Sequence, residues 1–227
     1  MHLELPNSRL ASFRDFARHY LMIVLSILTA LGLEAWIEHA HHAHAAEQAS
    51  LHIRTELLAN LSDVRKSIAT NRGLIAPLRQ LDETITKDIR DGMPAAAINQ
   101  YIQAHKKDFW LSINWPTFAS QSWDVAVANQ SASWMDTSVL RRYSEAYADL
   151  RETSDWISHD GTLLIDVPAV ERMRTLVDLG SPVDPVDFAT AVREMLNTSA
   201  ETQSHLQQLE GHLVAALGKE AESGAHG

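Results

Sequence analysis

The chain has 227 residues, of which 45% are hydrophobic and 21% charged, so neither wholesale disorder nor a polytopic membrane protein is indicated. It has no cysteine, which excludes disulfides, thiolate nucleophiles and cysteine-ligated zinc or iron–sulfur sites. The net charge of −10 arises after Ile37, where 16 of the 19 basic and 26 of the 29 acidic residues lie. Such an acidic body repels phosphates, so we expect no nucleic-acid partner.

The first predicted element is a membrane-spanning helix over residues 17–37. Residues 20–33 carry no charge, and their apolar flanks extend the segment to about 31 Å of helix, close to the ~30 Å hydrocarbon core of a bilayer. Three arginines precede the segment, whereas Arg54 is the first Lys or Arg after it. The positive-inside rule therefore predicts a cytoplasmic tail over residues 1–16 and a single-pass inner-membrane protein whose C-terminal domain is periplasmic.

Two alternatives to this anchor are a removed signal peptide and a buried helix of a soluble protein. Residues 21–33 also fit the length of the apolar region of a signal peptide. The residues that follow directly, Glu34-Ala35-Trp36, make a poor cleavage site, and the good A-x-A pattern at residues 43–45 lies too far downstream. We therefore expect an uncleaved anchor.

A cluster of four histidines, His39, His41, His42 and His44, follows the predicted span within six residues. Glu38 and His41 match Glu-x-x-His, the unit of di-iron helical bundles, but such a site needs a second unit and two further carboxylates, and the sequence has no second unit. The candidate metal ligands are Glu38, His41, His42 and His44, which an oligomer or an adventitious transition metal would have to complete. A pH-responsive patch is a further alternative, because the unperturbed pKa of histidine is ~6.5. We expect a solvated juxtamembrane helix without a metal.

The body is predicted to begin with a long helix over residues 57–89. Aliphatic residues recur there at alternating steps of four and three, which indicates a coiled-coil-like seam. The seam consists of Leu57, Leu61, Val64, Ile68, Ile75, Leu78, Ile85 and Ile89, with Asn71 and Asp82 as polar interruptions. Gly73 and Pro77 predict a kink between residues 71 and 77, and residues 91–92 predict the helix end.

Residues 94–179 are predicted to hold shorter helices and one irregular connection. Pro94 fits the first turn of a helix that runs to about His105. The connection that follows is rich in aromatic residues and contains Pro116. Further helices are predicted from Ser120, from the N-cap candidate Asp136, and between Pro168 and Gly180.

A second long helix is predicted from Pro185 to about residue 216, with Asp184 as its N-cap. Its seam consists of Phe188, Val192, Met195, Ser199, Thr202, Leu206, Leu209, Leu213 and Ala216. Two such helices cover each other when they pack antiparallel. We therefore predict an all-α fold: an N-terminal transmembrane helix followed by an up-and-down helical bundle with two long antiparallel helices. Residues 38–219 form its extracytoplasmic domain, and residues 220–227 form a disordered tail.

Four aromatic residues of the middle region, Trp123, Trp134, Tyr143 and Tyr147, stand out by their density. Aromatic side chains at this density can form a binding hot spot for a partner, and they can equally be the large side chains of a thin helical core. We favour the core and retain these residues as the candidate interaction site.

Several of these stretches together resemble a group of uncharacterised bacterial single-pass membrane proteins. The resemblance rests on the arginine-rich start, the span ending in LTALGLEAWIE, the histidine-rich exit, the stretch TELLANL, and SWDVAVANQSASWMDTSVLRRYSEAY. These stretches cover about a third of the chain. Trp134 departs from the pattern, because a small or aliphatic residue is expected at that position. The resemblance implies a bacterial envelope location with an all-α extracytoplasmic domain, and no chemistry.

The functional hypothesis is a membrane-anchored helical interaction or scaffold module of the bacterial envelope. We expect no enzyme, since HExxH, P-loop and GxGxxG patterns are absent from the sequence, and we expect no cofactor. The expected partners are the membrane and a second copy, joined through the polar-interrupted seam, or another envelope protein. The alternative function is a ligand-, pH- or metal-sensing extracytoplasmic domain.

Overall fold

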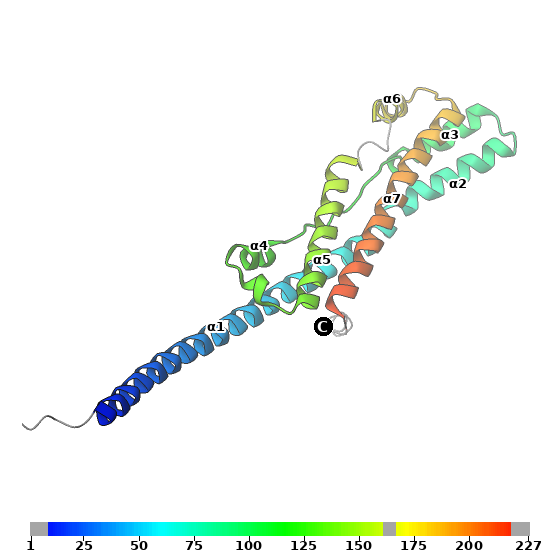
Figure 1. The fold of residues 1–227 in the computed structure, drawn as a ribbon. Helices are drawn as coiled ribbons and strands as arrows, with labels where there is room; N and C mark the ends of the chain where they lie inside the picture. The colour runs from blue at the N-terminus through cyan, green and yellow to red at the C-terminus, as the bar shows by residue number, and fades with distance from the viewer. Residues whose placement is uncertain (1–8, 161–166, 219–227) are drawn as a thin grey trace, which may run out of the picture.

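The computed structural model describes residues 9–160 and 167–218, and it is an all-α protein with no strand among these residues. The fold class predicted from the sequence is therefore confirmed. The whole predicted disordered tail and the first eight residues of the predicted cytoplasmic tail lie outside the described residues. The helices form an elongated body from which one helix extends as a long arm (Figure 1).

The arm is the first half of α1 (Arg9–Leu74), a single helix of 66 residues. From Phe13 to His41 every side chain of α1 is exposed except Val24, which is half-buried. An 18-residue stretch of this arm reaches a mean hydropathy of 1.9, and none of it is buried. Among the described residues, α1 is the one helix that is long and apolar enough to cross a membrane.

α1 ends at the predicted kink, and α2 (Ala76–Arg90) begins after Ile75. Pro77 lies in the first turn of α2, where its missing N–H removes a bond to the preceding turn. Gly92 follows the end of α2 with a φ of 71°, a left-handed conformation that glycine adopts without steric cost. The chain then reverses into α3 (Ala95–Ala104) and the short η1 (Lys106–Asp108).

A return segment, residues 109–135, leads back along α1 towards the arm. It consists of an extended stretch, α4 (Gln121–Ala128) and the short η2 (Ser131–Trp134). α5 (Thr137–Asp155) then begins at Asp136, whose carboxylate accepts hydrogen bonds from the N–H groups of Ser138 and Val139. The bonds from Ser138 and Val139 lower the pKa of Asp136. The predicted N-cap is therefore confirmed.

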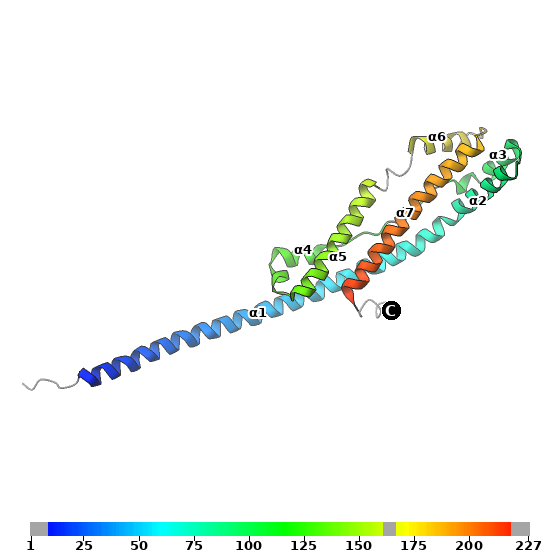
Figure 2. The same cartoon turned by 45° about the vertical axis from the view of Figure 1, so that its right-hand side comes forward.

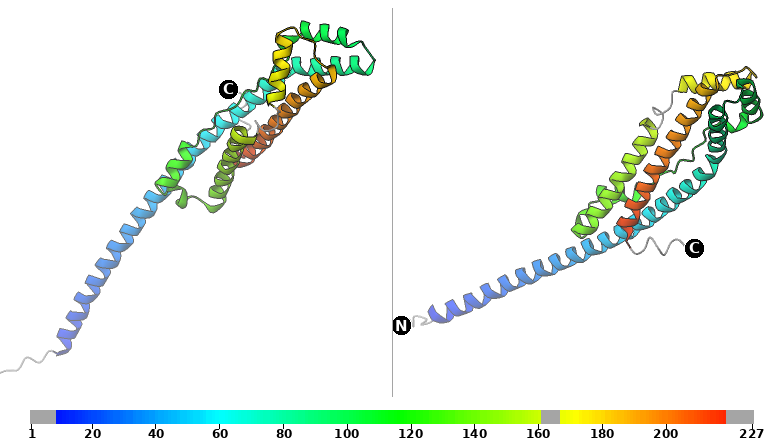
Figure 3. Two further views of the ribbon diagram at one scale, coloured as in Figure 1. Left: turned by 90° about the horizontal axis from the view of Figure 1, so that it is seen from above. Right: turned by 90° about the vertical axis from the view of Figure 1, so that its right-hand side faces the viewer.

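The second long helix is α7 (Pro185–Leu217), capped by Asp184 as predicted. It follows η3 (Trp156–Asp160), a π turn at the end of α5, and α6 (Val167–Asp178). α7 runs antiparallel to α1 and α2 along the whole body, and α5 lies beside its C-terminal half (Figures 2 and 3). The predicted antiparallel pair of long helices is thus the frame of the fold.

Two apolar clusters fill the body, one on each side of the kink. The proximal core, nearer the arm, joins α1, α5 and α7 through Ile53, Leu57, Leu61, Val64, Ile68, Tyr143, Tyr147, Leu150, Leu206, Leu209 and Leu213. The distal core joins α2, α3, α6 and α7 through Leu78, Leu81, Ile85, Ile98, Ile102, Phe109, Val177, Phe188, Val192 and Met195. α7 contributes to both cores and ties them into one body.

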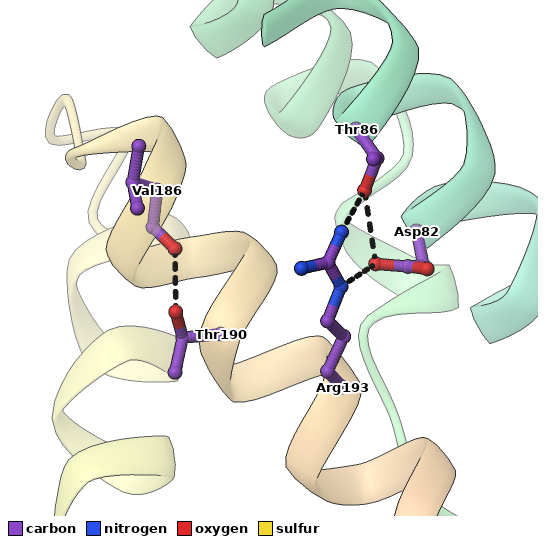
Figure 4. Close-up of polar contacts among 5 residues, drawn as sticks. All are labelled: Asp82, Thr86, Val186, Thr190 and Arg193. Carbon is purple, nitrogen blue, oxygen red and sulfur yellow. Dashed lines mark hydrogen bonds and ion pairs between the residues drawn. The ribbon is translucent and has the colours of Figure 1, made fainter. Parts of the chain in front are cut away.

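The polar interruptions of the first seam have partners inside the same chain. Asp82 accepts a hydrogen bond at 3.2 Å from Nε of Arg193 on α7, and the Arg193 guanidinium also donates to the Thr86 hydroxyl at 2.7 Å (Figure 4). Asn71 is bonded to the return segment. α7 and the return segment therefore cover this seam within one chain, and self-association of the chain stays a prediction.

Candidate functional site

The return segment and α5 contact α1 at several positions between the kink and the arm. Two asparagines of α1 bind the backbone of the return segment, Asn71 at Asn114 and Asn60 at Ala119. Each asparagine side chain accepts a hydrogen bond from the backbone N–H of its partner and donates one to the C=O of the same residue. These four hydrogen bonds are 2.6–3.0 Å long. They satisfy the backbone of an extended stretch that has no strand to pair with. The segment is thereby fixed in register along α1.

Below these clamps lies a bonded group around Glu56 of α1. The hydroxyl of Tyr147 donates to Oε1 of Glu56 at 2.5 Å, and the N–H of Ser122 donates to Oε2 at 2.9 Å. Tyr147 is 1% exposed, and Trp123 stacks on its ring with centroids 5.3 Å apart. Burial, and then the bond to Glu56, raise the pKa of Tyr147 above its ordinary value. The phenol therefore stays protonated and joins α5 and α4 to α1.

Tyr143 makes a second link one turn closer to the arm. Its ring is 3% exposed, and its hydroxyl lies 3.0 Å from the Ser50 hydroxyl on α1. Both tyrosines thus combine an apolar ring in the proximal core with a polar end bonded to α1, an arrangement typical of a buried tyrosine.

The last contact of the series joins the histidine cluster to η2. The rings of His42 and Trp134 stack with centroids 3.9 Å apart and planes 15° from parallel. Nε2 of His42 lies 4.0 Å from a carboxylate oxygen of Glu38, one turn nearer the span. Trp134 remains 37% exposed. The resemblance predicted a small or aliphatic residue at position 134. The tryptophan found there instead stacks on His42, a member of the histidine cluster.

The candidate metal ligands do not form a group in this chain. Glu38 and His42 lie next to each other, and the His41 and His44 side chains are exposed to solvent. Among the residues whose side chains the structure describes, no three His, Asp or Glu side chains converge on a point that could hold a metal ion.

The four aromatic residues of the candidate interaction site divide into two classes. Tyr143 and Tyr147 belong to the core, and Trp123 packs against it. Trp134 lies at the edge and keeps an exposed face. The structure brings all four to one place, the junction between the arm and the body, which we define by these residues together with their partners His42, Ser50 and Glu56 on α1.

Sequence reasoning missed the polar partners on α1, although a signal for them exists. Glu56, Asn60, Ser67 and Asn71 follow one another at steps of four, seven and four, which places them on one stripe beside the aliphatic seam. Asn60, Ser67 and Asn71 are buried, and Ser67 donates to the Asn114 side chain at 2.9 Å. A buried polar stripe at this spacing indicates a helix face that binds an extended segment.

A shallow groove of about 470 Å³ lies between α1 and α4 at the junction. It is lined by Ala45, Gln48, Ala49, His52, Gln121, Ser122, Val125, Ala126, Asn129 and Ser131. Its walls carry no Asp, Glu, Lys or Arg, in contrast to the acidic surface of the chain as a whole.

Comparison with known proteins identifies no relative from which a function could be inferred. The chain matches no family model, no curated protein and no solved structure.

Proposed function

We propose that this chain is a membrane-anchored helical interaction module of the bacterial envelope, with residues 17–37 in the inner membrane and the body in the periplasm. The observation that carries the proposal is the continuity of α1. One unbroken helix supplies an exposed apolar arm and then the long central helix of the proximal core. An apolar surface of this length is costly to expose to water, and a bilayer removes it from water.

The orientation is supported by the distribution of positive charge around the arm. Arg9, Arg14 and Arg18 precede the apolar stretch, whereas no Lys or Arg lies between Ile37 and Arg54. Lys and Arg in short flanking segments are retained on the cytoplasmic side. The resemblance to bacterial single-pass membrane proteins agrees with this orientation.

An interaction role, rather than catalysis, is supported by how the junction uses its polar groups. Both carboxylate oxygens of Glu56 accept hydrogen bonds from the same chain, and the Tyr147 hydroxyl is the donor of one of them. Groups engaged in this way hold helices together. The partner would be a second copy or another envelope protein, bound on the outer surface of the body.

Reporter fusions test the anchor and its orientation. A reporter that is active only outside the cytoplasm, fused after Gly218, should be active, and a cytoplasm-only reporter at the same position should be inactive. The protein should remain with the membrane after a high-salt or alkaline wash and dissolve in mild detergent. The opposite reporter pattern would refute the orientation, and release by the wash would refute the anchor.

A pull-down from mild detergent tests the interaction role. The full chain should retain a stoichiometric partner, either a second tagged copy or another envelope protein. A body that stays monomeric and without a partner at native expression would contradict the scaffold role and favour the alternative function.

The alternative is a pH-sensing domain, which one specific contact favours. His42 is the histidine of the cluster that contacts the body, through the stack on Trp134. A protonated imidazole on an indole face gains a cation–π attraction, so protonation would tighten this contact between arm and body.

A further inference from the structure

We propose that the tip of the return segment, residues 127–135, rests on the phospholipid headgroup layer, with Trp134 as its interfacial anchor. This inference depends on the proposed membrane anchor and goes beyond it, because it assigns a second, peripheral contact between the body and the bilayer. Four observations support it: the height of the tip along α1, its lack of charge, its satisfied backbone, and its exposed apolar side chains.

The height follows from the stack of Trp134 on His42. His42 lies five residues after Ile37, the end of the proposed span, which corresponds to about 7.5 Å along the helix axis. The headgroup layer extends about 5–7.5 Å beyond the hydrocarbon core on each side of a bilayer. Trp134 is therefore held at the outer edge of this layer, the region where membrane proteins favour tryptophan. Figure 1 shows α4 at the end of the body that faces the arm.

The charge pattern of the tip fits a bilayer surface better than the rest of the body does. No Asp, Glu, Lys or Arg lies between Val125 and Met135, in a chain in which one residue in five is charged. The remainder of the extracytoplasmic body is strongly acidic, and anionic lipids repel negative charge. A neutral tip can approach such a surface without this repulsion.

The backbone of the tip is bonded within itself, which lowers the cost of partial desolvation. The N–H of Ser133 donates to the Gln130 carbonyl at 3.0 Å, and the N–H of Met135 donates to the Ala132 carbonyl at 3.2 Å. The Asn129 side chain accepts from the N–H of Ser131 at 3.0 Å. The turn is thus preformed and does not rely on water for these groups.

Exposed apolar side chains surround this turn. Val127 is 52% exposed and Trp134 is 37% exposed, although both lie beside a well-packed core. The ring of Trp134 stacks on His42, and Ala132, two residues before it, is buried. A rigid aromatic side chain that presents one face to solvent is suited to the headgroup layer.

The absence of cysteine from the chain allows a direct test with single labels. The full chain is reconstituted into lipid nanodiscs with a fluorescent label on Ser133→Cys at the tip, Ala30→Cys in the span or Lys107→Cys at the far end of the body. All three residues are exposed. Lipids with a nitroxide on the headgroup should quench the label at 133 strongly and the label at 107 hardly at all, and lipids with a nitroxide on the acyl chain should quench the label at 30.

Two further variants separate contact from mere proximity. Trp134→Glu, made together with Ala128→Cys, should reduce headgroup quenching of the label at 128 in nanodiscs that contain anionic lipid, since these lipids repel a carboxylate at this position. Trp110→Glu, at an exposed tryptophan far from the arm, is the matched control and should leave that quenching unchanged. Circular dichroism of each variant checks that the helices are retained.

The outcomes distinguish the two proposals. If the label at 30 is not quenched by acyl-chain nitroxides, the membrane anchor fails and the tip contact fails with it. If the label at 30 is quenched while the label at 133 behaves like the label at 107, the anchor stands and the tip contact is refuted. Equal quenching at 128 with and without Trp134→Glu would also refute the role of Trp134.

Discussion

The two halves of the body share α7 but are held together by different chemistry. The proximal half combines an aliphatic core with tyrosines and asparagines that bond across elements up to 93 residues apart in sequence. The distal half relies mainly on aliphatic and phenylalanine packing, including Phe109 against Phe188 with centroids 4.6 Å apart, and its polar contacts come from Asn99 and Arg193. Apolar packing tolerates small shifts, whereas hydrogen bonds demand a fixed geometry. The half next to the arm is therefore the one whose orientation relative to α1 is specified most closely.

The largest expected effect is the loss of either core through a buried charge. Leu61→Asp or Leu209→Asp in the proximal core should each destabilise the body by about 4 kcal/mol or more, because the aspartate would lie unpaired in an apolar cluster. Leu61 is 2% and Leu209 is 1% exposed. Leu78→Asp is the matched change in the distal core. Thermal unfolding in detergent, followed by circular dichroism, measures all three.

Amide hydrogen exchange, measured on the same variants, shows whether the two halves unfold together. Because α7 runs through both cores, a charge in one core should also speed exchange in the other half. Melting temperatures unchanged from the parent for Leu61→Asp and Leu209→Asp would show that these helices do not face each other. Protection lost only on the mutated side would show two independent folding units.

A smaller effect is expected from the asparagine clamps, which occur in both halves. Asn71→Ala should cost about 1–3 kcal/mol, because the N–H and C=O of Asn114 lose their partners beside a buried surface. Asn99, which clamps Val183 in the distal half by the same pair of bonds, is only half-buried, so Asn99→Ala should cost less. Urea denaturation of the two variants measures the difference. A larger cost for Asn99→Ala would reverse the proposed distinction between the halves.

The Tyr147 hydroxyl gives the proximal half a specific dependence on alkaline pH. Tyr147→Phe should cost about 1–2 kcal/mol near neutral pH, since a hydrogen bond to a carboxylate is lost. The folded-state pKa of Tyr147 is raised, so above the unfolded-state value of about 10 the unfolded chain loses this proton first and stability falls as pH rises. The parent should therefore lose stability above about pH 10 more steeply than Tyr147→Phe. Parallel pH profiles for the two proteins would refute the contribution of Tyr147.

Local signals in the sequence predicted the elements of both halves well. Asp136 and Asp184 mark helix starts because their carboxylates cap free N–H groups, and Pro77 marks the kink because it lacks a donor. The two aliphatic seams predicted the antiparallel pair, since each repeats at helical spacing and needs cover. These signals act within a few residues, which is why they can be read without the fold.

The contacts of the junction could not be predicted in the same way. Glu56 and Tyr147 are 91 residues apart, and His42 and Trp134 are separated by a similar distance in sequence. Their meeting depends on the register of the return segment along α1, which the asparagine clamps set. The polar stripe on α1 indicates that something extended binds there, but it does not say which segment binds. The position of Trp134 beside the histidine cluster follows only from the folded chain.

The smallest expected effect concerns the histidine cluster. Replacing His39, His41, His42 and His44 together by Gln should retain α1, because Gln is a good helix former, and should leave insertion and oligomeric state unchanged. Loss of the stack between His42 and Trp134 should cost less than about 1 kcal/mol at this exposed edge.

Melting temperature, cross-linking and protease sensitivity at pH 7.5 and 5.5 compare the variant with the parent. A triple variant that keeps His42 is the matched control. We expect all three proteins to behave alike at both pH values, because the single contact of the cluster with the body lies at an exposed edge and contributes little to stability. A transition at the lower pH in the parent and the triple variant, absent from the quadruple variant, would assign a pH switch to the single contact between His42 and Trp134 and would favour the sensing function over the scaffold.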